Sequence, residues 1–269
     1  MMDEWVLYLL FGALAGVLSG LFGIGGGVVI VPFLAWRFPL RNFPPEHVMV
    51  IAVATSLSTI VITSIASIHA HHHHGAVDWR VVGRMAPGIL VGTLLGSIVA
   101  DHLPAYWFKL IFAGFLLYVA ARLLLKQAEQ GRELAPGIWL FGLAGGGIGL
   151  ASAILGIGGG TLSVPFLARC GYSIRHAVAI SSTCGFPIAI AGTLSYIALG
   201  WNQPGLPSPH LGYVYLPACL GIIITSTLFA PLGARLTHRL PTERLRRYFG
   251  VLVLAIGVKL LWQALEGPI

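Results

Sequence analysis

Residues 20–34 read GLFGIGGGVVIVPFL, and residues 153–167 repeat the pattern as AILGIGGGTLSVPFL. The second copy follows the first by 133 positions in a chain of 269 residues, so each half of the chain contains one copy. A glycine run of this density favours a break in a helix, because each glycine costs about 1 kcal/mol relative to alanine inside a helix. The repeat therefore predicts two related halves, residues 1–130 and 131–269, each of which opens with a broken helix.

The composition indicates a membrane protein. Hydrophobic residues make up 57% of the chain, charged residues make up 9%, and the mean hydropathy is +0.86, which leaves too little polar surface to cover a soluble domain. Several apolar runs approach or exceed the roughly 18 residues that span a bilayer core. The net charge of +7 comes from basic residues in short loops between these runs, a pattern typical of topology signals and not of a nucleic-acid surface. We therefore expect one integral, all-α, multi-pass membrane domain.

Each half contains four hydrophobic units, and two topologies are compatible with them. The units cover about residues 5–34, 48–68, 81–100 and 107–125, then 137–168, 177–199, 213–232 and 247–265. If all eight units cross, 10 of the 16 Lys and Arg residues lie inside and 6 outside. If the two broken units dip in and return as re-entrant segments, six helices cross and the division becomes 12 against 4. The second arrangement makes the halves inverted repeats, as in many secondary transporters, although the 17 apolar residues of 5–21 nearly suffice for a crossing.

The broken helices provide a candidate anion site. In lipid, a helix break is tolerated only where it faces protein or a water-filled cavity, and the freed amides need a partner. Short helices that begin near Val28 and Thr161 would point their N-terminal N–H groups into the protein, where an anion can bind without a charged side chain. The alternative is close helix packing through small residues. The candidate substrate-binding glycines are Gly23, Gly25, Gly26, Gly27, Gly156, Gly158, Gly159 and Gly160.

Four polar side chains occupy matching places in the two halves. Thr55 and Ser56 lie early in the second unit, and Thr183 and Cys184 lie early in the sixth. Hydroxyl donors can hold oxyanion oxygens while remaining neutral, so these residues belong to the candidate substrate site. The alternative is that each bonds to a carbonyl of its own helix. The spacing of the three cysteines indicates neither a disulfide framework nor a zinc site.

Titratable residues offer further candidates. His47 and His176 precede the second and sixth units, where either could carry a proton in a coupled cycle or simply lie at the membrane interface. All nine Asp and Glu residues lie in termini, loops or helix ends, so a cation transporter would lack its expected intramembrane carboxylates and an anion is favoured. The histidine-rich run His69–His74, which we expect in a loop, supports the alternative of a transition-metal transporter.

On these motifs the chain resembles the TauE/SafE family of sulfite exporters. The resemblance covers almost the whole chain and rests on GLFGIGGGVVIVPFL, on AVATSL at 52–57, on AILGIGGG at 153–160 and on AISSTCGF at 179–186. It implies export of sulfite, or of a small organosulfonate such as sulfoacetate, across the bacterial inner membrane.

The sequence therefore predicts a secondary transporter that moves a small sulfur-containing anion by alternating access around a site in the middle of the membrane. We expect no chemistry on the substrate, because no acid, base or nucleophile constellation is visible, and no cofactor, resident metal or nucleic-acid partner. The expected partners are the anion and the lipid bilayer, and a homodimer is compatible with the sequence. The rivals are the metal transporter and, from another class, a membrane enzyme or a channel-like scaffold.

Overall fold

Ten α-helices and one short β-hairpin form the described part of this computed structural model, which is residues 2–22, 26–73, 75–125, 137–236 and 242–266. The first half contains α1 (Met2–Phe22), α2 (Gly27–Arg37), the 3-10 turn η1 (Pro39–Arg41), α3 (Val48–His73), α4 (Trp79–His102) and α5 (Ala105–Leu124). The second half contains α6 (Ile138–Leu155), α7 (Gly160–Arg169), α8 (Ile174–Leu199), β1 (His210–Leu211), β2 (Val214–Tyr215), α9 (Leu216–Leu236) and α10 (Thr242–Leu265). The prediction of an all-α protein is confirmed apart from the hairpin.

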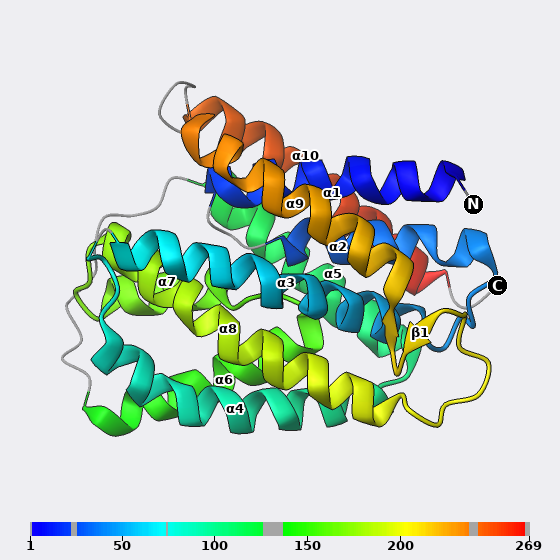
Figure 1. Cartoon of the computed structure of the whole chain (residues 1–269), viewed down its shortest axis with the longest axis horizontal. Coiled ribbons are helices and arrows are strands. Elements are labelled where there is room, and N and C mark those ends of the chain that lie inside the picture. The colour runs from blue at the N-terminus through cyan, green and yellow to red at the C-terminus, as the bar shows by residue number, and fades with distance from the viewer. Residues whose placement is uncertain (1, 23–25, 74, 126–136, 237–241, 267–269) are drawn as a thin grey trace.

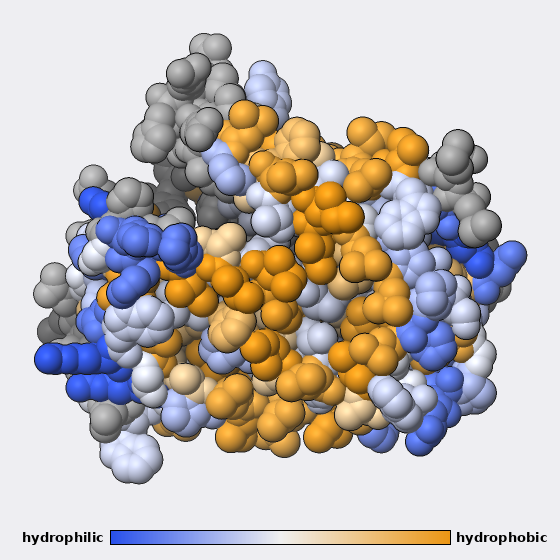
Figure 2. Space-filling model, in the orientation of Figure 1, coloured by the Kyte–Doolittle hydropathy of each residue, from blue (hydrophilic) through white to orange (hydrophobic). Residues whose placement is uncertain are grey.

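The helices and the surface are those of a membrane protein. Within the described residues, five helices are long and apolar enough to span a bilayer: α3, α4, α5, α8 and, over Arg247–Leu265, α10. Large apolar side chains such as Val91 and Leu94 are about half exposed, which in water would forfeit the free energy of burying them. Figure 2 shows apolar residues gathered over the middle of one face and hydrophilic residues at the two ends of the long axis. Lipid is the solvent that fits this surface.

Both predicted helix breaks fall at the glycine runs. In the second half, α6 ends at Leu155 and α7 begins at Gly160. Gly156 and Gly159, which flank the break, have φ angles of 65° and 76°, in the left-handed region that only glycine enters without strain. In the first half, α1 ends at Phe22 and α2 begins at Gly27. The candidate residues Gly23 and Gly25 lie outside the described residues.

The main helix contacts join the two halves of the chain. The long helices α3 and α8 pack side by side through the middle of the bundle (Figure 1). On either side of them, α1 packs against α9, α4 packs against α6, and α5 packs against α10. Each of these four pairs takes one helix from each half. Neither half is therefore a separate folding unit, and the hydrophobic core is shared.

Small residues allow α4 and α6 to approach closely. A Cβ atom on Gly88 or Gly92 of α4 would overlap the carbonyl oxygen of Gly142 or Gly146 of α6. Helices in membranes associate through such small-residue faces, because lipid tails offer no hydrophobic driving force between helices. The sequence interpretation weighed this kind of packing only for the GIGGG runs. The structure shows small-residue packing between α4 and α6, which the sequence interpretation did not predict.

Three sequence-based expectations about local structure were wrong. The histidine run was expected in a loop, but His69 to His73 form the last turn of α3, where imidazole groups suit the negative end of the helix dipole. His176 was expected before its helix, but it lies in the first turn of α8, whose N-cap is Ser173. The seventh hydrophobic unit was expected to begin at about residue 213, but residues 210–215 form an antiparallel hairpin that pairs His210 with Tyr215, and α9 begins only at Leu216.

Candidate anion site at the helix breaks

The two helix breaks meet in the interior of the bundle. A Cβ atom on Gly27, the first residue of α2, would overlap the carbonyl oxygen of Gly156 and lie 2.9 Å from Ile157 Cα. A Cβ atom on Gly156 would in turn lie 2.8 Å from a methyl group of Val31 and 3.0 Å from Val53 Cα in α3. Such distances leave no room for a side chain, so glycine is required for the two breaks to touch.

The second break is also held against α8. A Cβ atom on Gly185 of α8 would lie 3.0 Å from the carbonyl oxygen of Gly158, and one on Gly158 would lie 3.3 Å from Ile60 of α3. Gly159 packs beside Ile188 of α8. The break is therefore enclosed by α2, α3 and α8, which is the protein-facing environment that an interrupted membrane helix requires.

Backbone amides at the start of α7 have no carbonyl partner among the described residues. The amides of Gly156 and Ile157 both donate to the Ser152 carbonyl, and those of Leu162 and Ser163 donate to Gly159. Between them, in the described part of the chain, the amides from Gly158 to Thr161 donate to no backbone carbonyl. The Thr161 hydroxyl beside them is buried and has no hydrogen-bond partner among the described atoms. Free N–H groups at a helix start favour an anion through both hydrogen bonding and the helix dipole.

The four predicted polar side chains are buried but play different parts. Ser56 donates to the Gly156 carbonyl at 2.8 Å and so ties α3 to the second break. Thr55 accepts the Tyr215 amide at 3.0 Å, which anchors β2. Thr183 donates to Ala179 in its own helix, the alternative that the sequence left open. Cys184 is fully buried. The hydroxyl that the sequence interpretation missed is Thr161, because its counterpart in the first half, Val28, carries no polar group.

A cavity of about 390 Å³ opens beside Thr183. Its walls come from α3, α4 and α8, and they are apolar apart from the threonine hydroxyl and the Trp79 indole. The lining residues are Ile65, Ile68, Trp79, Val82, Thr183, Phe186 and Pro187. The cavity lies toward the C-terminal end of α3 and the N-terminal end of α4, and no residue of the helix breaks lines it.

The comparison with known proteins decides the family. The sequence profile described as "Sulfite exporter TauE/SafE" matches residues 8–260, which is nearly the whole chain. The chain belongs to this family.

Relatives of this TauE/SafE protein are described as membrane transporters. A "probable membrane transporter protein" of Haemophilus influenzae is 40% identical over 259 residues, which cover 95% of this chain and 97% of the relative. A protein of the same description from Methanocaldococcus jannaschii is 29% identical and covers 95% and 94% of the two chains. The "probable inner membrane transporter protein TsaS" of Comamonas testosteroni is 25% identical over 73% of this chain and 79% of its own. No solved structure matches. The TauE/SafE protein is thus a multi-pass protein of the inner membrane and a membrane transporter by family.

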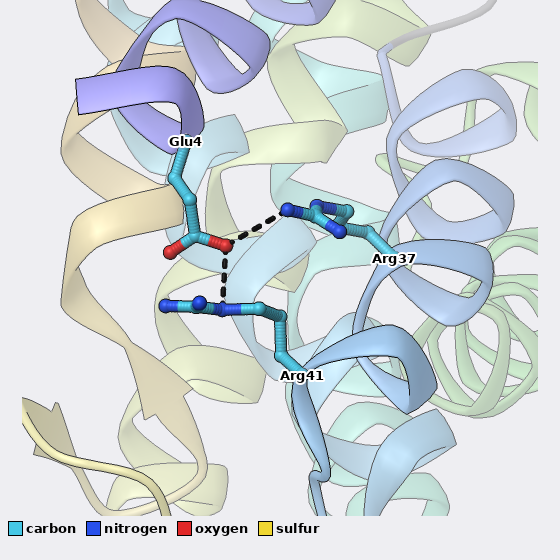
Figure 3. A network of polar contacts seen from close by, with 3 residues as sticks. All are labelled: Glu4, Arg37 and Arg41. Atoms are coloured by element: carbon cyan, nitrogen blue, oxygen red, sulfur yellow. Dashed lines mark hydrogen bonds and ion pairs between the residues drawn. The ribbon is translucent and has the colours of Figure 1, made fainter. Parts of the chain in front are cut away.

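An ion-pair network in this TauE/SafE protein joins the start of α1 to the end of α2. The Glu4 carboxylate lies 3.1 Å from the Arg37 guanidinium and 2.6 Å from that of Arg41 (Figure 3). The side chains of Glu4 and Arg37 are only 10% and 17% exposed, so the pair is weakly screened by water. The first residues of the broken segment and its last residues therefore lie at the same end of the bundle.

The histidines that the sequence singled out lie away from the helix breaks. The His47 ring lies 5.7 Å from the ring of Tyr213, and His176 is exposed and bonds through Nδ1 to the Ser173 hydroxyl at 2.9 Å. In the histidine run, His72 accepts from the Trp79 indole at 3.3 Å, and the His69 and His73 rings lie 4.4 Å apart. Among the described residues, which exclude His74, no three His, Cys, Asp or Glu side chains come together as metal ligands.

Proposed function

We propose that this TauE/SafE protein is a secondary transporter that exports a small sulfur-containing anion, such as sulfite or sulfoacetate, by alternating access around the two helix breaks. The proposal rests on the contact of Gly27 with Gly156 in the interior of the bundle. Beside this contact, the amides from Gly158 to Thr161 have no carbonyl partner among the described residues. An oxyanion of sulfur presents several acceptor oxygens and no donor. The free amides from Gly158 to Thr161 and the Thr161 hydroxyl are complementary to such a group.

The neutrality of the proposed site favours an anion, and the membrane potential assists the export of an anion. The described residues around the breaks carry no carboxylate that would repel an anion or hold a cation. A monovalent anion that leaves a negative-inside cell gains about 2.3 kcal/mol per 100 mV of membrane potential. Export therefore needs no chemical step on the substrate.

We further propose that α1–α2 and α6–α7 are re-entrant pairs and that the two halves are inverted repeats. The Glu4–Arg37 ion pair supports a returning first segment, because it joins the beginning of α1 to the end of α2. With both pairs re-entrant, 12 basic residues fall on one side and 4 on the other, and the side rich in arginine is the cytoplasm. The cavity beside Thr183 then lies on the cytoplasmic side and serves as an inner vestibule.

The packing of the first helix of each half supports the same repeat. A Cβ atom on Gly12 of α1 would lie 2.8 Å from Ile222 Cα in α9, and one on Gly145 of α6 would lie 3.3 Å from Met85 Cα in α4. The two glycines are 133 positions apart, and Ile222 follows Met85 by 137 positions. The first offset is the one that separates the two glycine runs, and the second differs from it by four positions, about one helical turn. The first helix of each half thus packs on the fourth helix of the other half in the same register.

Counterflow in proteoliposomes tests the proposed site. Vesicles that contain purified protein and unlabelled sulfite or sulfoacetate should exchange it for external labelled substrate. Gly159→Ala should abolish exchange, because φ is 76° and the new methyl group would lie 2.7 Å from Ile188. Gly147→Ala in α6 is the matched control, since a Cβ there would meet no described atom within 4 Å. Exchange that survives Gly159→Ala unchanged in a folded protein would refute the site.

The same vesicles separate the metal alternative. Replacement of His69, His71, His72 and His73 by alanine leaves the helix breaks intact, and the proposed anion transporter should keep its exchange activity. Loss of transport in this variant, together with uptake of Zn²⁺ or Ni²⁺ by the wild type, would favour the metal transporter instead. The homodimer stays a prediction.

A further inference from the structure

A second group of buried polar side chains lies apart from the helix breaks, along one face of α4. Thr93, Ser97 and Asp101 follow one another at intervals of four residues, so they share a face of the helix. Thr93 and Ser97 are fully buried, and the Asp101 side chain is 13% exposed. Polar groups on a membrane helix are retained where they face protein and have a function.

Two tyrosines cover this face. Tyr196 of α8 is fully buried; its hydroxyl donates to the Ala153 carbonyl at 3.0 Å and interacts with Ser97. Tyr213, between β1 and β2, is 1% exposed, and its hydroxyl interacts with Asp101. Burial first, and this hydrogen bond second, raise the pKa of Tyr213 well above its usual value. The phenol therefore stays protonated and serves as the donor to the carboxylate.

Thr93, Ser97 and Asp101 form a column of polar groups along α4. The column continues inward through polar atoms that lack hydrogen-bond partners. In the described part of the structure, Oδ1 of Asp101 and the hydroxyls of Thr93 and Ser152 are buried without a hydrogen bond. Ser152 precedes Ala153 in α6, and its carbonyl accepts the amides of Gly156 and Ile157. The polar column thus runs from the end of α4 to the break between α6 and α7. Buried groups of this kind in a native protein call for a water molecule, an ion or a functional role.

We propose that Asp101 is the proton-coupling residue of the transport cycle and that this column links it to the helix breaks. The inference rests on the proposed transport function. Protonation of Asp101 from the outer side removes the charge that holds the Tyr213 hydroxyl, and so loosens the hairpin from the end of α4. The polar column connects this event to the α6–α7 break, where the anion is proposed to bind.

The surroundings of Asp101 suit a proton and not a fixed ion pair. The groups that face Asp101 are His102, whose Nδ1 lies 4.0 Å from Oδ2, with Tyr213 from the hairpin and Tyr196 from α8. No titratable residue occurs in α6, and His47 of the outer end faces Tyr213. Glu4 offers a contrast within the same protein, since two arginines hold its charge. Among the described residues, no arginine or lysine lies within ion-pair distance of Asp101.

The test compares Asp101→Asn with Glu266→Gln, a control at an exposed carboxylate. Asparagine keeps the shape and the acceptor oxygen of aspartate but cannot bind a proton. The probe is sulfoacetate, whose two acidic groups both stay ionised near neutral pH. In wild-type and Glu266→Gln vesicles, a gradient of one pH unit should drive up to about tenfold accumulation for one coupled proton. In Asp101→Asn vesicles accumulation should fall to a ratio of about one, while counterflow without a gradient continues.

A second measurement needs no substrate. Infrared difference spectra between acidic and neutral pH should show the carbonyl band of a protonated buried carboxyl group in the wild type and in Glu266→Gln, and this band should be absent in Asp101→Asn. Accumulation driven by the pH gradient in Asp101→Asn, or an unchanged infrared band, would overturn the inference. If the wild type exchanges no sulfoacetate, the proposed transport of this substrate fails by itself, and the infrared band alone decides whether Asp101 binds the proton.

Discussion

The contact between the two helix breaks makes Gly27→Ala the most informative substitution. The new Cβ atom would overlap the carbonyl oxygen of Gly156 and lie 2.9 Å from Cα and 3.0 Å from Cγ2 of Ile157. Gly27 is not among the described residues with positive φ, so alanine meets no backbone strain there. The substitution therefore acts through steric overlap and not through backbone strain.

The size of the effect follows from which atoms must move. Alanine at an open helical position stabilises a protein by roughly 0.5–1 kcal/mol relative to glycine. At position 27 two of the three nearest atoms belong to the backbone of the second break, so no side-chain rotation relieves the overlap. Inserting a methyl group into such a contact typically costs about 1–3 kcal/mol. We expect a net loss of about 1–2 kcal/mol of stability. Substrate binding should weaken about tenfold for each 1.4 kcal/mol by which the substitution reduces the binding free energy.

The assay measures thermal unfolding in detergent and sulfite counterflow on the same preparation. Gly114→Ala in α5 is the matched control, because its Cβ would come within 4 Å of no atom in the described part of the chain, and it should be neutral or stabilising. Gly27→Ala should unfold at a lower temperature and exchange sulfite at least several-fold more slowly. If Gly27→Ala matched Gly114→Ala in both measurements, the two breaks would not touch as described. The proposed site, which rests on that contact, would then be refuted.

Three further predictions concern the ends of the bundle. Glu4→Gln should destabilise the protein by about 1–3 kcal/mol, because it leaves the buried Arg37 without its carboxylate; unchanged thermal unfolding in detergent would contradict the ion pair. Burial raises the pKa of the Cys170 thiol, so less of the reactive thiolate is present at neutral pH. Alkylation of Cys170 should therefore be slower than that of free cysteine, and its rate should still rise above a pH of about 8.5. In a Cys170→Ser background, Leu40→Cys should react with an impermeant thiol reagent only from outside, whereas native Cys170 should react only from the cytoplasm; labelling of both from one side would exclude the re-entrant topology.

The sequence could predict what is local and repeated. The glycines from Gly156 to Gly160 predicted a helix break, and α6 ends and α7 begins there. A glycine run alone is not sufficient, however, because Gly145 to Gly147 lie within the unbroken helix α6. The apolar runs likewise predicted the long helices to within a few residues. The histidine run was misjudged because a polar composition was taken for a loop, although the residues simply extend α3 past the apolar core.

The contacts between the halves could not be predicted in this way. The spacing of Gly88, Gly92 and Gly96 is typical of a helix-packing face, but the partner helix α6 lies more than 50 positions away in the sequence and is not named by that pattern. The same is true of Asp101: its place at a helix end suggested solvent, but its side chain is only 13% exposed and the Tyr213 hydroxyl of the hairpin bonds to it. Thr161 was missed for a different reason. Comparison of the two halves singles out polar residues that occur in both, and the residue that corresponds to Thr161 in the first half is the apolar Val28.

Equivalent glycines in the two breaks adopt different conformations. Gly26 and Gly159 are 133 positions apart and each is the N-cap of its short helix, yet φ is −62° at Gly26 and 76° at Gly159. In a transporter built from inverted repeats, the two halves exchange conformations as the site opens to the opposite side. On the proposed function, Gly26 should therefore take up the positive φ of Gly159 in the opposite state, and Gly159 should take up the negative one.

Gly26→Ala tests this exchange. In the present state, the one described residue that the new Cβ would meet is Ile30, at 2.9 Å from Cδ1, a flexible end that can rotate away. The variant should therefore unfold at nearly the temperature of the wild type, yet it should exchange sulfite slowly, because alanine at positive φ costs roughly 1–2 kcal/mol in the opposite state. Gly159→Ala should instead lower both stability and exchange. If Gly26→Ala exchanged sulfite at the wild-type rate, the two breaks would not exchange conformations, and their difference would be a fixed asymmetry of the fold.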